Sequence, residues 1–222
     1  MTTRLVFFLV LILNSLAVIA AITIYSYTGV NHFKEGGFIT ILSFLQLLVI
    51  CRIVFQIKRH SLWKNPSAVW TIIALGFLFL AADELFKIHE NIDFLIHYVF
   101  NMQETGLTDR IDDILIGLYG LTGIGVLFAY RNELKTYREA LPFFICGFVL
   151  LFTMVALDVL TNRNDILPLI FDRHQATTLH AFLSLTEDSL KIFAESFFIL
   201  AFYVILQTAK SRGKEAVLPT VG

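Results

Sequence analysis

The chain has few of the residues that mark soluble enzymes and nucleic-acid-binding proteins. Its two cysteines, Cys51 and Cys146, form no C-x-x-C pair, so neither a zinc ribbon nor a dithiol redox centre is supported. No basic run is interleaved with aromatic residues, and the formal net charge of -1 gives no attraction to nucleic acid. H-E-x-x-H, a repeated E-x-x-H and G-x-S-x-G are also missing, so the usual ligand and nucleophile patterns of hydrolases are not present.

Apolar residues, in contrast, are in large excess. Of the 222 residues, 57% are hydrophobic and 22 are Phe, and the mean hydropathy is +0.74. A soluble domain of this size could hardly cover so much apolar area with polar surface. The composition therefore predicts an all-α polytopic membrane protein.

Six segments are long and apolar enough to cross a bilayer, since twenty helical residues span roughly 30 Å. The third is expected to stay helical beyond Ala82, to bend near Glu90 and to place residues 92–100 in the membrane interface. On the fourth, Gly117, Gly120 and Gly123 recur every third residue, which favours close helix packing. We expect one domain over residues 1–209, followed by a polar cytoplasmic tail at 210–222. The six predicted helices cover residues 5–24, 38–57, 66–90, 111–130, 142–160 and 176–209.

The distribution of basic residues predicts the topology. With six crossings, the two termini and the second and fourth loops share one side, which carries 11 Lys and Arg residues against 5 on the other side. The positive-inside rule then puts both termini in the cytoplasm, with the protein in the plasma (inner) membrane.

Ionisable residues occur at membrane depth in four of these helices. The apolar run of the third helix ends in Ala82-Asp83-Glu84-Leu85-Phe86-Lys87-Ile88-His89-Glu90. Measured from the cytoplasmic ends, the acids of the four helices lie at similar depths, roughly 22 to 28 Å. They are expected to form one charged layer in the outer leaflet, facing the bundle interior or a wet cavity.

The charged helices are related in pairs. Asp83 and Asp112 are 29 residues apart, and so are Asp158 and Glu187, which superposes the two pairs at an offset of 75 residues. This spacing predicts a duplicated helical hairpin, with repeat units at about 66–131 and 142–206. Two such hairpins would aim their carboxylates at a common centre, as metal-binding bundles do.

The first functional hypothesis is a cation site. Such a concentration of acids must be protonated, hydrated or coordinated to cations, which suggests that the protein transports or conducts a divalent cation or protons. Carboxylate ligands favour Ca²⁺, Mg²⁺ or Mn²⁺, whereas His89 or His180 as ligands would favour Zn²⁺ or Fe²⁺. The candidate metal ligands are Asp83, Asp112, Asp158 and Glu187 with these two histidines, and the full cation- or proton-binding set is Asp83, Asp112, Asp113, Asp158, Glu187, Asp188, Lys191 and Glu195.

Two alternatives stay open. One is an intramembrane metal-dependent hydrolase that acts on a lipid-like substrate, with Glu84 or Glu90 as general base. The other is a structural or sensor subunit whose ionic layer only fixes helix register. The expected partners are the bilayer and a small cation or lipid-like substrate, with no nucleic acid and no organic cofactor. The oligomeric state and cleavage of the first helix stay open.

Overall fold

The computed structural model describes residues 2–34, 36–60, 68–103, 105, 108–161 and 165–215, and within these it contains helices and no strand. Six helical spans are long and apolar enough to cross a membrane, which confirms the predicted number. They are formed by α1 (Thr3–Thr28), α2 (Phe38–His60), α3 (Ala68–Phe86), α5 (Ile111–Ala129), α7 (Leu141–Thr161) and α8 (Arg173–Glu215).

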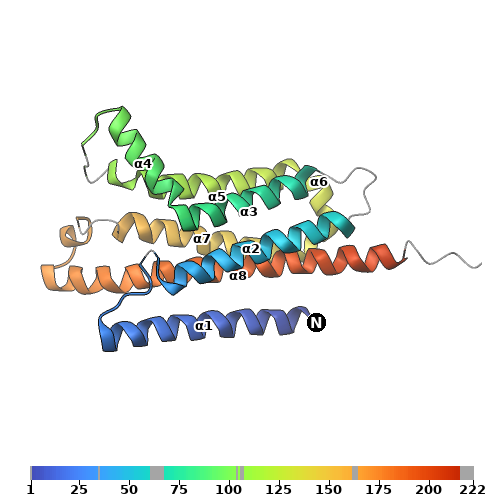
Figure 1. Cartoon of the computed structure of the whole chain (residues 1–222), viewed down its shortest axis with the longest axis horizontal. Helices are drawn as coiled ribbons and strands as arrows, with labels where there is room; N and C mark the ends of the chain where they lie inside the picture. Colours follow the sequence, from blue (N-terminus) through green and yellow to red (C-terminus); the bar gives the residue numbers. More distant parts are fainter. Residues whose placement is uncertain are drawn as a thin grey trace, which may run out of the picture.

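The long helices lie side by side as one elongated bundle. Figure 1 shows the start of α1 and the end of α8 at the same end, and the short helix α4 (Ile88–Val99) at the opposite end. Near the termini, α6 (Arg131–Leu134) and the 3₁₀ helix η2 (Lys135–Ala140) connect α5 to α7. This arrangement agrees with an even number of crossings, which the charge pattern requires.

The central helix of the bundle is α8. It packs against α1, α2 and α7, and its side chains Leu200, Phe202 and Ile205 are almost fully buried in the main core. Helix α1, in contrast, is peripheral and exposes apolar side chains such as Phe8 and Leu16. Exposed hydrocarbon of this kind suits a lipid-facing surface, because lipid tails solvate it.

The glycines of α5 bring this helix close to α7. A Cβ atom at Gly120 would lie 3.0 Å from Leu151 Cδ2 and 3.2 Å from Phe152 Cζ, and one at Gly123 would lie 3.5 Å from Phe148 Cζ. The predicted role of the glycine series in close packing is therefore confirmed, and the partner of α5 is α7.

The bend after α3 lies three residues earlier than expected. Lys87 adopts a left-handed conformation with φ of 53°, and it separates α3 from α4. One carboxylate oxygen of Asp83 accepts a hydrogen bond from the backbone N–H of His89 at 2.8 Å, which satisfies a free donor at the start of α4. An acid one turn before the bend thus fixes its position, which helical periodicity does not reveal.

Two other boundaries differ from the expectation. Helix α8 begins at Arg173 and continues to Glu215, so the first residues of the predicted tail are helical. The expected start of the first repeat at residue 66, and residues 216–222 of the tail, lie outside the described residues. Beyond the bend, α4 exposes the aromatic side chains of Phe94 and Tyr98, and its expected position in the membrane interface stays a prediction.

Candidate functional site

The acids that the sequence singled out surround one cavity of about 640 Å³. Its walls come from α2, α3, α5, α7 and α8, toward the end of the bundle that carries α4. The lining includes every residue of the predicted cation- or proton-binding set. Its charged and histidine members are Lys34, Asp83, Glu84, Lys87, His89, Glu90, Asp112, Asp113, Asp158, Glu187, Asp188, Lys191 and Glu195.

Asp83 and His89 form a pair on the wall at the α3–α4 bend. Asp83 Oδ2 lies 2.8 Å from His89 Nδ1, while its other oxygen holds the His89 backbone N–H. Burial of the ring acts to lower the pKa of His89, but the hydrogen bond and charge of Asp83, with Glu90 and Asp112, outweigh it and raise the pKa above the ordinary value. The bend therefore turns a sequence pair six residues apart into an oriented acid-histidine pair.

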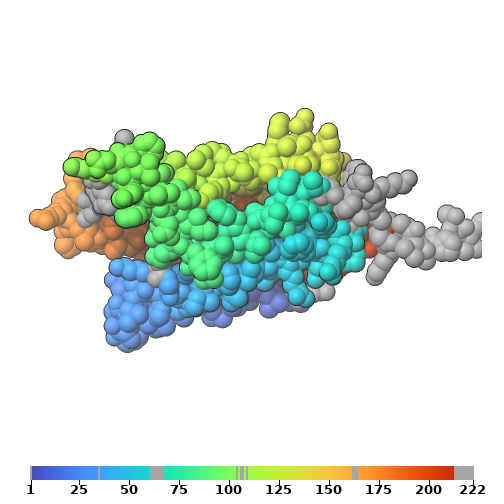
Figure 2. All heavy atoms as spheres, turned by 45° about the horizontal axis from the view of Figure 1, so that its top comes forward, coloured from blue at the N-terminus to red at the C-terminus, as the bar shows by residue number. Residues whose placement is uncertain are grey.

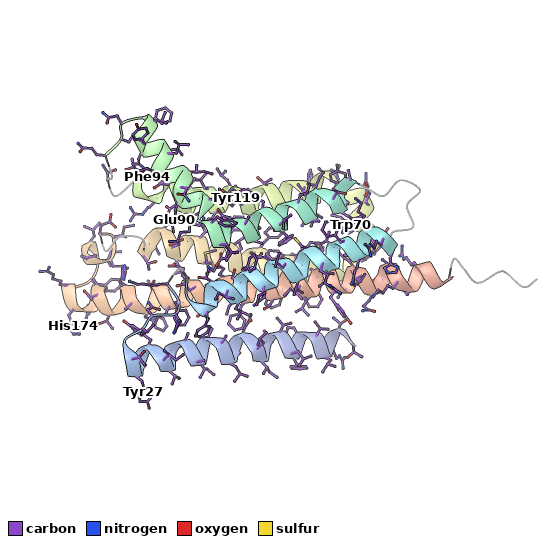
Figure 3. All side chains as sticks on the ribbon, in the orientation of Figure 1. Tyr27, Trp70, Glu90, Phe94, Tyr119 and His174 are labelled. Carbon is purple, nitrogen blue, oxygen red and sulfur yellow. The ribbon has the colours of Figure 1, made fainter. Side chains whose placement is uncertain are left out.

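Two of the three lysines are held by carboxylates. Lys191 Nζ on α8 lies 2.8 Å from Glu84 Oε1 on α3, and both side chains are mostly buried. Lys87 Nζ lies 3.4 Å from Glu90 Oε2 in a more exposed pair, near the place that Figure 3 labels for Glu90. Nine carboxyl groups face three lysines in the lining, so these pairs leave most of the negative charge uncompensated.

Three further carboxyl groups meet across α5, α7 and α8. Asp113, Asp158 and Glu187 all line the cavity, where the Asp158 carboxyl interacts with the other two, and the Thr161 hydroxyl donates a hydrogen bond to Glu187 Oε2 at 2.5 Å. Two carboxylates this close cannot both stay charged unless a proton or a cation is shared between them. This cluster therefore concentrates carboxyl groups from three helices at one place in the cavity wall.

Glu195 lies deeper in the same cavity. Its Oε1 accepts a hydrogen bond from Ser43 of α2 at 2.5 Å, whereas its buried Oε2 has no hydrogen-bond partner among the described residues. The residue is only 6% exposed. Tyr119 of α5 also lines the cavity, and its buried hydroxyl likewise has no hydrogen-bond partner among the described residues. Such groups are costly unless something binds them.

The inner end of the cavity is apolar. Phe77 and Phe198 lie in the lining with ring centroids 5.9 Å apart, and Phe198 also packs against Phe148 at 5.1 Å. Phe144 and Phe202 extend this aromatic cluster toward the termini. The cavity thus has an ionic part near the bend and an aromatic floor.

The surface is hollowed beside the cavity. Figure 2 shows a depression between α3 and α5, in which part of α8 is visible. Along this seam, Phe79 and Tyr119 make an edge-to-face contact at 5.2 Å. A side opening of this kind would face the hydrocarbon of a bilayer.

The metal ligands that the sequence suggested are only partly brought together by the fold. Of the predicted ligands, Asp83, His89, Asp112, Asp158 and Glu187 line the cavity, and His180 is not in the lining. Instead, His180 Nε2 lies 2.7 Å from the Thr161 carbonyl oxygen. Within the described part of the chain, no three His, Cys, Asp or Glu side chains are arranged to hold a metal ion.

Sequence reasoning missed the hydroxyl groups of the site. Ser43 and Thr161 each donate to a cavity carboxylate, and Tyr119 supplies an unpaired hydroxyl. Thr161 stands three residues after Asp158, on the same helical face, which is the only signal that could have found it. Ser hydroxyls in apolar helices usually bond to their own backbone, and Tyr is common in membrane helices, so Ser43 and Tyr119 carry no distinguishing mark.

Fold and site together define an all-helical protein, over the described residues, with six helices long and apolar enough to cross a membrane and an acidic cavity inside the bundle. The chain belongs to the family described as "Domain of unknown function (DUF8692)", which matches residues 4–206. No curated protein matches the chain. No solved structure matches it either.

Proposed function

We propose that the protein binds cations or protons in this cavity in the course of transport across, or permeation into, the membrane. The observation that carries the proposal is the Asp113–Asp158–Glu187 cluster, in which neighbouring carboxyls from three helices must share positive charge. Intramembrane acids of this kind are costly for folding alone and are typical of ion pathways.

The proposal includes the orientation and the architecture of the site. Both termini are cytoplasmic, so the cavity lies in the outer half of the plasma (inner) membrane, with its acids in one charged layer. Helices α3 and α5 form one hairpin and α7 and α8 its duplicate. The equal spacing of Asp83 to Asp112 and of Asp158 to Glu187 supports the duplication. The partners differ, since Asp83 binds His89 and Asp158 binds other carboxyls, so the two halves would have diverged in role.

Protons or a loosely held cation suit the cavity better than a tightly ligated divalent ion. A divalent ion needs six or more oxygen ligands converging on one point, and within the described residues not even three candidate ligands do so. Lys191, inside the lining, further opposes a dense metal site. Binding of Ca²⁺, Mg²⁺ or Mn²⁺ would require the acids to rearrange.

Proton exchange on cation binding tests the proposal. The detergent-purified full chain is mixed with Mn²⁺ or an organic ammonium ion in weakly buffered solution, and released protons are followed with a pH indicator. The expected result is proton release that is lost in Asp158→Asn and kept in Glu139→Gln, which changes an exposed acid that does not line the cavity. Absence of both proton release and bound cation in the unmodified protein would overturn the proposal.

One observation favours an intramembrane hydrolase as a second candidate. The Asp83–His89 pair has the arrangement in which a carboxylate orients a histidine as general base, and it borders a cavity that is hollowed toward the side of the bundle. Glu84 and Glu90 are engaged by lysines, so His89 fits the role of base better than either. Hydrolysis of a fluorogenic lipid ester that is lost in His89→Asn would establish this activity, and no turnover in the unmodified protein would remove it.

A further inference from the structure

The cavity is larger than an inorganic ion requires. Its volume of about 640 Å³ falls in the range of small-molecule pockets, roughly 300 to 1,000 Å³. A proton or a metal ion would use only the carboxylates and leave the remaining space to water. The size of the cavity therefore indicates an organic ligand.

The lining changes character with depth. On the apolar side it consists of Phe77, Leu80, Ile116, Leu151, Met154 and Phe198, which belong to α3, α5, α7 and α8. These side chains cannot stabilise a hydrated ion, but they can bury hydrocarbon at about 25 cal/mol per Å² of apolar area. Aromatic faces such as those of Phe77 and Phe198 can also attract an organic cation directly.

An unpaired charge-binding group lies where the two parts meet. Glu195 stands three residues before Phe198 on α8, so both side chains lie on one face of the helix. Its Oε2 atom is buried without a hydrogen-bond partner among the described residues. The charge of Lys191 also acts on Glu195, but the Lys191 ammonium group is hydrogen-bonded to Glu84, and Lys87 is paired with Glu90.

We infer that the cavity binds an amphipathic organic cation, with its ammonium-type group held by Glu195 and the neighbouring carboxylates and its hydrocarbon part packed against Phe77 and Phe198. The inference rests on the proposed function and names its substrate class. The hollow between α3 and α5 gives such a molecule a route from the hydrocarbon of the bilayer, where it would concentrate. Binding would displace protons from the carboxyl cluster on α5, α7 and α8, since a second positive charge competes for the same oxygens.

Equilibrium dialysis of the detergent-purified full chain with radiolabelled tetraphenylphosphonium tests the inference. Tetramethylammonium, which has the charge without the large apolar part, is the matched competitor. Saturable binding is expected, with little displacement by tetramethylammonium.

Glu195→Gln should weaken binding at least about tenfold, because it removes the charge from a buried ion contact. Leu80→Gln, on the apolar wall, should weaken it about fivefold or more through lost hydrocarbon contact. Glu139→Gln should leave it unchanged.

The outcomes separate this inference from the proposed function. If tetraphenylphosphonium does not bind but Mn²⁺ still releases protons, the amphipathic ligand is wrong and the cation site stands. If binding is equal in the unmodified protein and in Glu195→Gln and Leu80→Gln, the probe binds elsewhere and the inference is overturned. If neither probe binds nor any proton is released, both proposals fall.

Discussion

Two groups of buried polar residues are adjacent on α8, and their polar atoms differ in how fully they are hydrogen-bonded. Ser196 belongs to a neutral network with Asn14 of α1 and Gln46 of α2, in which Asn14 Nδ2 donates to Ser196 Oγ at 2.6 Å and Gln46 Nε2 donates to Asn14 Oδ1 at 2.8 Å. All three residues are at most 4% exposed. Glu195, one residue earlier, faces the acidic cavity with one oxygen unpaired.

This difference in hydrogen bonding separates polar residues that stabilise the fold from polar residues that line the proposed binding site. The Asn14 network satisfies its own groups and fastens α1 to α2 and α8, as interhelical hydrogen bonds in membranes do. The cavity is lined by nine carboxyl groups and three lysines, and under the proposed function a proton or cation from outside the chain supplies the remaining positive charge. We expect substitutions in the neutral network to change stability alone, and substitution of Glu195 to change binding with little effect on stability. The Lys191–Glu84 pair lines the cavity but neutralises itself, so we expect its loss to change stability.

The largest loss of stability is expected from Lys191→Met. The substitution leaves Glu84 without its cationic partner in a largely buried place, which costs about 2 to 3 kcal/mol, less than for a fully buried pair. Thermal unfolding in detergent measures it. The double variant Lys191→Met with Glu84→Gln should recover most of the loss, and failure to recover would mean that Lys191 acts through other partners.

The next largest loss of stability is expected from Asn14→Leu. It leaves Gln46 Nε2 without its acceptor and removes the bonds from Asn14 to Ser196 and to the Ile192 carbonyl, at a cost of about 1 to 2 kcal/mol. The same unfolding assay reports this cost. Retained binding of tetraphenylphosphonium would support a purely structural role, and lost binding at unchanged stability would break the comparison.

Glu195→Gln should barely change stability. The amide keeps an acceptor for Ser43 and removes an uncompensated charge, so the free energy of unfolding is expected to stay within about 0.5 kcal/mol or to rise. Unfolding of the ligand-free protein is the measurement. A loss comparable to that of Asn14→Leu would place Glu195 with the structural network.

The smallest change in stability is expected from loss of the ion pair between Arg110 and Asp165, near the α7–α8 connection. Asp165 Oδ1 lies 2.7 Å from Arg110 Nη2, and this hydrogen bond and charge lower the pKa of Asp165, against a small opposing effect of burial. Because the pKa of Asp165 is lowered in the folded protein, the ion pair stabilises the fold at pH values above the ordinary carboxyl pKa. This stabilisation is lost as the pH falls through the lowered pKa of the folded state.

Asp165→Asn should therefore shift the unfolding temperature only slightly at neutral pH, because the side chain is 41% exposed and solvent screens the pair. The difference between variant and unmodified protein should shrink toward zero as the pH is lowered below about 4. A difference that grows on acidification would contradict this assignment.

Much of the fold followed from apolar runs, since a bilayer requires each crossing to be a helix of sufficient length. The six spans and the close packing of the α5 glycines were predictable from residue type and spacing. The bend at Lys87 was not, because it depends on Asp83 capping a helix six residues away. The pairing of Lys191 with Glu84 across helices, and of His180 with the Thr161 carbonyl, likewise depends on which helix faces are turned toward each other.

The sequence by itself determined that acids from four helices lie at one end of the membrane-spanning bundle, because hydropathy and helical rise fix depth. Only the tertiary structure decided which of these acids lie close to one another, which are paired with a lysine, and which one has a buried oxygen without a hydrogen-bond partner among the described residues. Contacts between helices depend on rotation about the helix axis and on packing, and α8, at the centre of the bundle, brings the carboxylates, the lysine and the aromatic floor into one cavity.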